Sequence, residues 1–192
     1  MTTVQHPAPL DAPADDGACD HLPRTRLPPG LALPATSGRL VDLSALPPEP
    51  PRTVIYAYPR TAGPDGAVPE GWDAIPGARG CTPQSCAFRD HHAELAGLGA
   101  AVFGLSTQDT AYQREAAARL HLPFDLLSDA GLRFATALRL PTFEAGGETL
   151  IRRVTLVLRG GAVEHAFYPV HPPAESAAVV LRWLRERRRA EG

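Results

Sequence analysis

The sequence predicts an α/β protein in which helices cover both faces of a mixed central β-sheet. Two patterns carry this prediction. Apolar runs of strand length alternate with helical segments between residues 53 and 138, an order typical of parallel strands joined by helical crossovers. A hairpin with a Gly160-Gly161 turn follows at residues 154–167 and would add antiparallel strands. A chain of 192 residues suits one such domain.

The first part of the chain has a different composition. Residues 1–28 are rich in Pro, Ala and Asp and show no hydrophobic periodicity, so we expect a poorly ordered N-terminal tail. Residues 29–189 would form the folded domain, interrupted by an inserted loop at residues 62–79.

The elements of the first half follow from local patterns. Residues 31–43 predict a hairpin, with Thr36-Ser37-Gly38 as its turn. Residues 53–58 form a nearly continuous β-favouring run, which indicates a buried central strand ended by Pro59. The long loop that follows, up to Gly80, is of a length that is usually functional or mobile. A helix should begin near Thr82 and Pro83 and run to about residue 97 or 99.

The second half repeats the alternation. Residues 101–105 and 124–127 predict two further strands. A helix capped within residues 107–110 should end at Leu120, and another, capped by Ser128 or Asp129, should end near Leu138. After the hairpin, Pro172 and Pro173 open a last helix, whose apolar stripe comprises Val179, Val180, Trp183 and Leu184.

Composition excludes several classes of protein. A formal net charge of −2 gives no electrostatic case for binding nucleic acid. No apolar run is long enough to span a membrane, and the N-terminus lacks the pattern of a secretory signal. We therefore expect a cytoplasmic protein, in which stable structural disulfides are unusual. A cysteine pair in that setting points to catalysis or metal binding.

The segment from Gly80 to Asp90 carries two of the three cysteines, Cys81 and Cys86. Cys81 lies at the predicted helix start, where backbone N–H groups and the helix dipole favour negative charge. A thiol there loses its proton more easily, and the thiolate is the reactive form. Cys86 lies inside the helix as a second thiol. The pair predicts redox chemistry in which one sulfur reacts and the other rescues it.

Four segments in order resemble the peroxiredoxin family, most closely its peroxiredoxin Q (bacterioferritin-comigratory) subfamily. They are the strand end Tyr58-Pro59, the helix start Gly80-Cys81-Thr82-Pro83-Gln84-Ser85-Cys86, the segment Leu126-Leu127-Ser128-Asp129, and the strand Arg153-Val154-Thr155-Leu156-Val157 before a glycine turn. The similarity covers roughly residues 31–184. Each segment is a weak signal alone, but their order and spacing together are specific.

The resemblance implies a thioredoxin-like fold and a thiol peroxidase that reduces hydrogen peroxide and organic hydroperoxides. Cys81 would be the peroxidatic cysteine, oxidised to a sulfenic acid, and Cys86 the resolving cysteine that forms a disulfide with it. A thioredoxin-type dithiol would reduce this disulfide. No metal, flavin or haem cofactor is expected. The resemblance favours a monomer and leaves a dimer open.

Arg153 is predicted to hold Cys81 as a thiolate and to orient the peroxide, because its guanidinium stays protonated. The alternative for Arg153 is a structural ion pair. Arg152 should point to the other face of the strand. Pro59 and Gln84 are predicted to border the substrate, although a solvated position in the first helical turn is the alternative for Gln84.

The chain departs from the family motif before the active cysteine. The family places a Thr or Ser three residues before that cysteine, where this chain has Ala78, and the insertion separates Thr61 from Cys81. We expect Thr61 to supply the hydroxyl, with the extra loop extruded. If the Thr61 side chain points away from Cys81, Thr82 would supply this hydroxyl instead, or no residue would. Trp72 and Ile75 of the insertion are expected to line an apolar approach for organic peroxides.

Disulfide formation between Cys81 and Cys86 would require a conformational change. Residues five apart on a helix have Cα atoms roughly 8–9 Å from each other. This exceeds the limit of about 7 Å for a disulfide. We therefore expect a reduced helical form and an oxidised form in which residues 81–88 are locally unfolded.

Three rival interpretations are open. Cys81, Cys86, His91 and His92 could bind zinc, but their spacing does not match the usual patterns. A thiol–disulfide oxidoreductase normally has Cys-x-x-Cys, which is absent. A binding or structural protein with inert cysteines would leave the helix-start position of Cys81 unexplained. Cys19 is expected to be a bystander; it could instead resolve Cys81 or link two chains.

Overall fold

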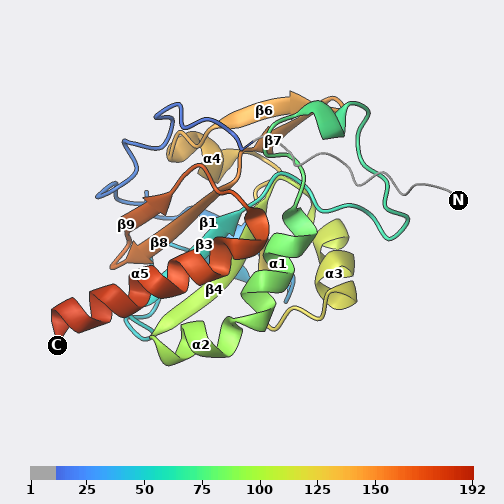
Figure 1. The fold of residues 1–192 in the computed structure, drawn as a ribbon. Coiled ribbons are helices and arrows are strands. Elements are labelled where there is room, and N and C mark those ends of the chain that lie inside the picture. The colour runs from blue at the N-terminus through green and yellow to red at the C-terminus, as the bar shows by residue number, and fades with distance from the viewer. Residues whose placement is uncertain (1–11) are drawn as a thin grey trace, which may run out of the picture.

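A five-stranded mixed sheet forms the centre of the computed structural model, which describes residues 12–192 (Figure 1). Strands β3, β4 and β5 are parallel, whereas β8 runs antiparallel to β3 and β9 antiparallel to β8. The predicted α/β class with a mixed sheet is therefore confirmed. The strands lie in the order β5-β4-β3-β8-β9, with bounds Leu126–Ser128, Ala100–Ser106, Arg52–Ala57, Val154–Arg159 and Ala162–Phe167.

The register places the end of β3 beside the start of β8. Ala57 pairs with Val154 at this end, and Thr53 pairs with Leu158 at the other. The chain therefore leaves β3 and enters β8 at one end of the sheet, which is also where the parallel strands have their carboxyl ends. In open α/β sheets, ligands bind outside these carboxyl ends.

Helices α1 (Cys81–Asp90), α2 (His92–Gly97) and α5 (Ser176–Glu191) cover one face of the sheet (Figure 1). The short helix α4 (Arg133–Ala137) and the hairpin of β1 (Ala32–Pro34) and β2 (Leu40–Asp42) cover the other. Helix α3 (Thr110–Arg119) packs beside β5. No helix among residues 12–192 combines the length and the apolar character needed to cross a membrane.

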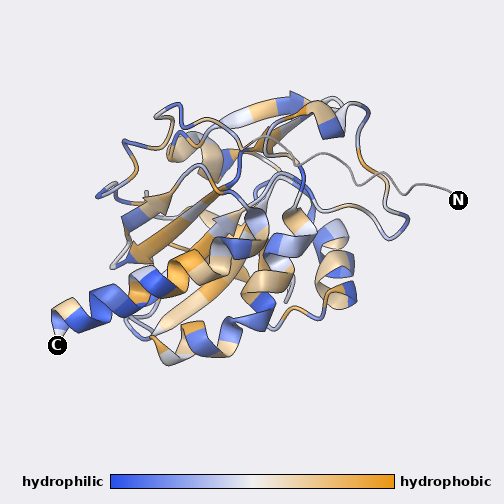
Figure 2. Ribbon diagram, in the orientation of Figure 1, coloured by the Kyte–Doolittle hydropathy of each residue, from blue (hydrophilic) through white to orange (hydrophobic). Residues whose placement is uncertain are grey.

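Side chains of β3 alternate between two apolar cores. Val54 and Tyr56 belong to the core under α1 and α5, whereas Ile55 belongs to the core under α4. This is the alternation that a strand buried on both faces requires. Figure 2 shows the central strands largely in orange and the C-terminal turns of α5 mostly in blue, because that end of the helix extends beyond the core.

The helix predicted from Thr82 to about residue 97 is two helices. α1 ends at Asp90, the backbone of His91 leaves the helical region (φ −99°, ψ 7°), and α2 begins at His92. Neither Gly nor Pro marks this break in the sequence. The change of direction allows Leu95 to enter the same core as Phe88, and both side chains are fully buried.

Acidic side chains from both predicted cap regions bind the starts of the next two helices, although the N-cap residue of α4 is Leu132, which makes no side-chain capping bond. Asp109 caps α3 by accepting a hydrogen bond from the backbone N–H of Tyr112 at 2.8 Å. The Asp129 carboxylate accepts from the backbone N–H groups of Phe134 and Ala135 at 3.0 and 2.8 Å. These bonds satisfy donors that a helix start leaves unpaired.

One hairpin was not predicted. Strands β6 (Thr142–Ala145) and β7 (Glu148–Ile151) pair antiparallel around Gly146 and Gly147, both of which have positive φ. Ala145 and Leu150 of this hairpin pack with Trp72 and Ala78 of the insertion in a small separate core. The hairpin therefore supports the loop that leads to Cys81.

The tail prediction for residues 1–28 needs correction where the structure describes the segment. Residues 1–11 lie outside the described residues. Leu22 and Leu27 are buried in the main core. The backbone N–H of Arg24 donates to the carbonyl of Val163, and that of Leu27 to the carbonyl of Gly161. The segment thus packs along the outer edge of β9. Backbone hydrogen bonds and a few buried apolar side chains hold this segment in place. Such contacts leave no hydrophobic periodicity in the sequence. The domain boundary at residue 28 stays a prediction.

Candidate active site

Cys81 is the first residue of α1, and its side chain is only 3% exposed. The preceding residue, Gly80, has φ 100° and ψ 14°, a left-handed conformation suited to glycine. A Cβ atom at Gly80 would also lie 2.6 Å from Cγ of Pro173. Glycine is therefore required both for the turn into the helix and for its close approach to the segment before α5.

Arg153 lies directly before β8 and reaches the sulfur. Its Nη2 is 3.2 Å from Sγ of Cys81, and the protonated thiol donates to the carbonyl of Ala78 at 3.5 Å. The guanidinium is 4% exposed, and its Nε is buried with no hydrogen-bond partner. The structure therefore places a buried cation and the start of a helix beside the Cys81 sulfur. Arg152 is exposed, as strand alternation predicts.

Backbone carbonyls contact the same nitrogen of the guanidinium as the sulfur does. Nη2 of Arg153 lies within 3.3, 3.3 and 3.0 Å of the carbonyl oxygens of Gly77, Ala78 and Arg79. These residues end the insertion. The loop thus fixes the arginine that contacts Cys81, although the insertion itself interrupts the family motif.

Gln84 is completely buried, so the solvated alternative is wrong. Its Oε1 accepts a hydrogen bond from Nη1 of Arg153, and its Nε2 donates to Oγ of Ser176 at 3.3 Å. Pro59 is also buried; its carbonyl accepts from Oγ of Ser106 at 3.2 Å, and the residue does not line the pocket beside Cys81. Gln84 thus contacts Arg153, which in turn contacts the Cys81 sulfur, whereas Pro59 lies two residues after the end of β3 and outside the pocket lining.

In the described part of the chain, the Thr61 hydroxyl is not hydrogen-bonded to Cys81. The Thr61 hydroxyl donates to Oε1 of Gln108 at 3.2 Å, and the Thr61 carbonyl accepts from the Tyr112 hydroxyl at 2.9 Å. Thr61 is buried and absent from the pocket lining, whereas Thr82 lies in that lining. Gln108, which satisfies the hydroxyl, is far away in sequence, so this outcome had no local signal.

A pocket of about 280 Å³ opens beside Cys81. The insertion supplies its apolar wall, formed by Ala62, Val68, Trp72 and Ala78. Two arginines of the lining, Arg60 and Arg79, form ion pairs with Glu148 and Asp73. Ile75 is not part of the lining, contrary to expectation; it packs with Trp72 in the small core.

Cys86 lies further along α1 and is half-buried. All three cysteines are free thiols, and α1 is helical through both Cys81 and Cys86. The guanidinium of Arg89 lies beside Asp90 and Cys86, which both raise its pKa. The structure is therefore the form in which Cys86 cannot reach Cys81 without unwinding of the helix.

Cys19 lies in the main core and is 5% exposed. Burial, followed by the charges of Asp16, Asp15 and Asp20, raises the pKa of the Cys19 thiol to about 12. The thiol therefore stays protonated near neutral pH and is a poor nucleophile. This environment supports the bystander interpretation over a role in resolving Cys81.

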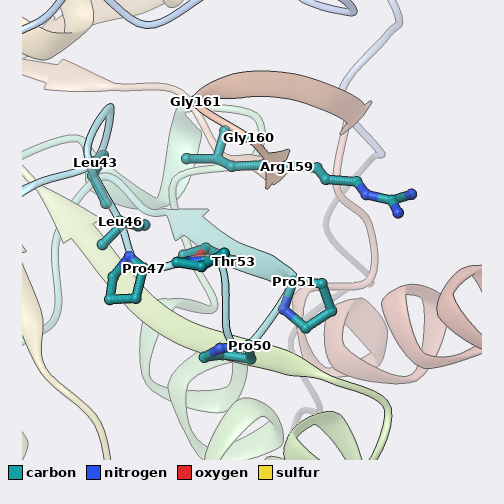
Figure 3. Close-up of a pocket in the computed structure, with 11 residues that line it drawn as sticks. Leu43, Leu46, Pro47, Pro50, Pro51, Thr53, Arg159, Gly160 and Gly161 are labelled. Atoms are coloured by element: carbon teal, nitrogen blue, oxygen red, sulfur yellow. The ribbon is translucent and has the colours of Figure 1, made fainter.

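A larger groove lies at the opposite end of the sheet, where Thr53 pairs with Leu158 (Figure 3). It has a volume of about 380 Å³ and is lined mainly by prolines and leucines, among them Pro47, Pro50 and Leu46. It contains no cysteine, histidine or acidic residue. The volume of a pocket alone therefore does not identify the active site of this protein.

The zinc interpretation finds no cluster to support it. Across residues 12–192, no group of three or more His, Cys, Asp or Glu side chains is arranged to hold a metal. Nδ1 of His91 lies 3.1 Å from the Glu94 carboxylate, and the ring of His92 packs against Phe124 at 5.7 Å.

Comparisons with known proteins agree on one family. Residues 15–181 match the Redoxin family model. The chain is 32% identical over 178 residues to the wheat (Triticum aestivum) protein "Peroxiredoxin Q, chloroplastic", covering 92% of this chain and 73% of the relative. Among solved structures, peroxidoxin BcpB from Mycobacterium tuberculosis aligns with TM-score 0.69 and 24% identity, over 86% of this chain and 98% of that one. The Xanthomonas campestris bacterioferritin comigratory protein, described for its alkyl peroxide reduction activity, aligns with TM-score 0.63 and 22% identity, over 93% and 99%.

Proposed function

Because this chain belongs to the peroxiredoxin Q subfamily of the Redoxin family and is thus a thiol-dependent peroxidase, we propose that Cys81 is its peroxidatic residue. The contact of 3.2 Å between Arg153 and Cys81, at a helix start that opens onto a pocket, carries this proposal. Cys19 and Cys86 lack that combination.

In the first step, the Cys81 thiolate attacks one oxygen of the hydroperoxide. The S–O bond forms as the O–O bond breaks, the sulfur is oxidised to a sulfenic acid, and the leaving alkoxide or hydroxide takes up a proton. Arg153 stabilises the thiolate before the reaction and the negative charge on the oxygens during it. Its Nε–H is buried and has no hydrogen-bond partner in the structure.

Thr82 takes the place that Thr61 was predicted to fill. Thr82 lines the pocket immediately after Cys81, whereas the Thr61 hydroxyl is bonded to Gln108. The Thr82 hydroxyl can both donate to and accept from a peroxide oxygen. The hydroxyl of the family motif is therefore supplied from the helix rather than from the loop before it.

In the second step, the Cys86 thiol attacks the Cys81 sulfenic acid, a disulfide forms and water leaves. α1 unwinds locally over residues 81–88 to allow this. The N-cap residue Gly80 makes no side-chain capping bond, so no side-chain cap must be broken at this end of the helix.

In the third step, a thioredoxin-type dithiol donates two electrons to the Cys81–Cys86 disulfide and itself becomes a disulfide. The unwound segment would present the disulfide to this donor. A reducing compartment such as the cytoplasm supplies dithiols of this kind, although the wheat relative is named as chloroplastic. As the subfamily resemblance implies, we favour a monomer as the catalytic unit.

A disulfide map after one equivalent of hydrogen peroxide tests this mechanism. We expect fully reduced protein to form a Cys81–Cys86 link and to keep Cys19 as a free thiol, as measured by mass spectrometry of peptides. Cys81→Ser should form no such link. A sulfinic Cys81 with Cys86 still free would contradict the resolving step, and an unreacted Cys81 would contradict the peroxidase mechanism itself.

The apolar wall of the pocket predicts a preference for organic hydroperoxides. Trp72→Ala removes the largest apolar side chain of the lining, so kcat/KM for tert-butyl hydroperoxide should fall by about fivefold to tenfold. Hydrogen peroxide has no alkyl group, and its kcat/KM should change little. Steady-state kinetics with both peroxides give the ratio of kcat/KM for tert-butyl hydroperoxide to kcat/KM for hydrogen peroxide.

Phe143→Leu is the matched control for Trp72→Ala. The Phe143 ring lies 6.3 Å from that of Trp72 in the same small core but outside the pocket lining. If Phe143→Leu lowers this ratio of kcat/KM values as much as Trp72→Ala does, loosening of the loop explains the effect. The apolar wall of the pocket would then have no role in the preference for organic hydroperoxides.

A further inference from the structure

A chain of buried hydrogen bonds connects the active-site arginine to the start of α5. Nη1 of Arg153 donates to Oε1 of Gln84, Nε2 of Gln84 donates to Oγ of Ser176, and Ser176 and Thr155 share a hydrogen bond of 3.2 Å. Arg153, Gln84, Ser176 and Thr155 are all at most 4% exposed. Buried networks of this kind contribute only if each member is satisfied.

The chemistry of the side chains fixes which group donates in the first two of these hydrogen bonds. Arg153 has no acceptor, so Gln84 must turn its amide oxygen toward the guanidinium. The amide NH₂ of Gln84 is then the donor to Ser176, whose oxygen accepts. The hydroxyls of Ser176 and Thr155 share a further hydrogen bond, in which either can be the donor, and Thr155 lies in β8, two residues after Arg153. The series of hydrogen bonds therefore ends in β8, the strand that Arg153 directly precedes.

The start of α5 is held firmly against the start of α1. Pro173, three residues before Ser176, lies so close to Gly80 that a Cβ atom there would clash with it. The 3-10 helix Pro173–Glu175 contacts α1 directly. The position of the Ser176 hydroxyl is thus fixed relative to the helix turn that carries Cys81.

We propose that Ser176 is a positioning residue of the peroxidase, which acts on Cys81 by fixing the Gln84 amide and, through it, the guanidinium of Arg153. The proposal rests on the roles proposed above for Cys81 and Arg153. Without the Ser176 hydroxyl, the Gln84 NH₂ loses its acceptor and the amide is free to rotate. Arg153 would then spend less time at hydrogen-bond distance from the sulfur.

Alkylation of Cys81 in full-length Ser176→Ala tests the proposal without any peroxide. We expect iodoacetamide to react with Cys81 about fivefold more slowly at neutral pH, the effect of one lost hydrogen bond. The midpoint of the pH profile of this reaction should move upward, because less thiolate is present. Mass spectrometry of peptides separates Cys81 from Cys86 and Cys19. The titratable and charged groups that face the sulfur or line its pocket are the same in both proteins: Arg153, Arg60, Arg79, Asp73, Tyr56 and Tyr58.

Two variants separate positioning from a general loss of packing. Ser176→Thr keeps the hydroxyl and should restore the wild-type profile. Ser128→Ala removes a hydroxyl that is equally buried, at 5% against 4% exposed, but that donates to the carbonyl of Gln108 instead. Ser128→Ala should leave the Cys81 profile unchanged. An unchanged profile in Ser176→Ala, or an equal shift in Ser128→Ala, would overturn the proposal.

Should Ser176→Ala fail to fold, Thr155→Val provides a second test. It removes the hydroxyl that shares a hydrogen bond with Ser176, with little change of shape, and a smaller upward shift of the midpoint is expected. No shift would overturn the proposal. This test is independent of the test of the peroxidase mechanism. If Cys81 of the wild-type protein is alkylated rapidly but the protein consumes no peroxide, the peroxidase mechanism is contradicted. The alkylation profiles of the variants can still be compared in that case.

Discussion

Replacement of Cys81 by serine is expected to lower hydroperoxide consumption by about a thousandfold or more, as loss of a catalytic nucleophile does in other enzymes. Arg153 and the start of α1 can stabilise a thiolate, but a serine hydroxyl stays protonated beside them at neutral pH. The measurement is the second-order rate constant for hydrogen peroxide, from stopped-flow mixing with fully reduced protein.

The other two cysteines provide matched controls. Cys86→Ser should keep the first oxidation of Cys81 at the wild-type rate but block the disulfide, so that excess peroxide drives Cys81 to the sulfinic acid. Cys19→Ala should leave both the rate and the disulfide unchanged, because burial and nearby carboxylates keep this thiol protonated, with a pKa of about 12. A normal rate in Cys81→Ser, or a greatly reduced one in Cys19→Ala, would show that the wrong sulfur has been assigned.

The parts of the site that could be predicted are those with local signals. Cys81 follows a glycine turn and opens a helix, and Arg153 precedes an apolar strand, so each position is visible within a few residues of sequence. Their contact follows from the pairing of β3 with β8, which places the loop after one strand beside the residue before the other. The central strands were equally visible, because long apolar runs need burial on both faces.

The parts that could not be predicted depend on contacts between distant segments. Gln84 and Ser176 are 92 residues apart, and no pattern near either indicates that they share a hydrogen bond. Thr61 was expected at the sulfur, but Gln108, 47 residues away, captures its hydroxyl. Both outcomes concern polar side chains, whose partners are decided by tertiary packing rather than by hydrophobic periodicity.

Two structural elements were missed for a related reason. The β6–β7 hairpin has strands of only four residues, too short for alternation to be distinguished from chance. The segment around Leu22 and Leu27 lacks any regular period, and backbone hydrogen bonds to Gly161 and Val163 hold it. Each element supports the domain with a few apolar residues that follow no regular period in the sequence.

Replacement of Arg153 by glutamine is expected to reduce the rate constant for peroxide by about a hundredfold or more, comparable to the loss of one donor that stabilises developing charge. The variant loses the cation at 3.2 Å from Cys81 and the bonds to Gly77, Ala78 and Arg79 that close the loop over the pocket. Arg153→Lys should recover only part of the activity. A single ammonium cannot reach Gln84, the sulfur and the loop carbonyls together, whereas the planar guanidinium does. Stopped-flow oxidation of the reduced variants gives the rates.

Arg152→Gln is the matched control, because it removes the same charge one residue away. Arg152 is exposed on the opposite side of the chain, so its loss should change the rate less than twofold, the range expected for an exposed charge. Thermal unfolding of each variant must accompany the kinetics, since buried carbonyls left without Arg153 cost about 1–3 kcal/mol of stability. If Arg153→Lys is fully active, point charge alone explains the role of Arg153. If Arg152→Gln is as slow as Arg153→Gln, the general positive field of this strand, rather than the direct contact with the sulfur, activates Cys81.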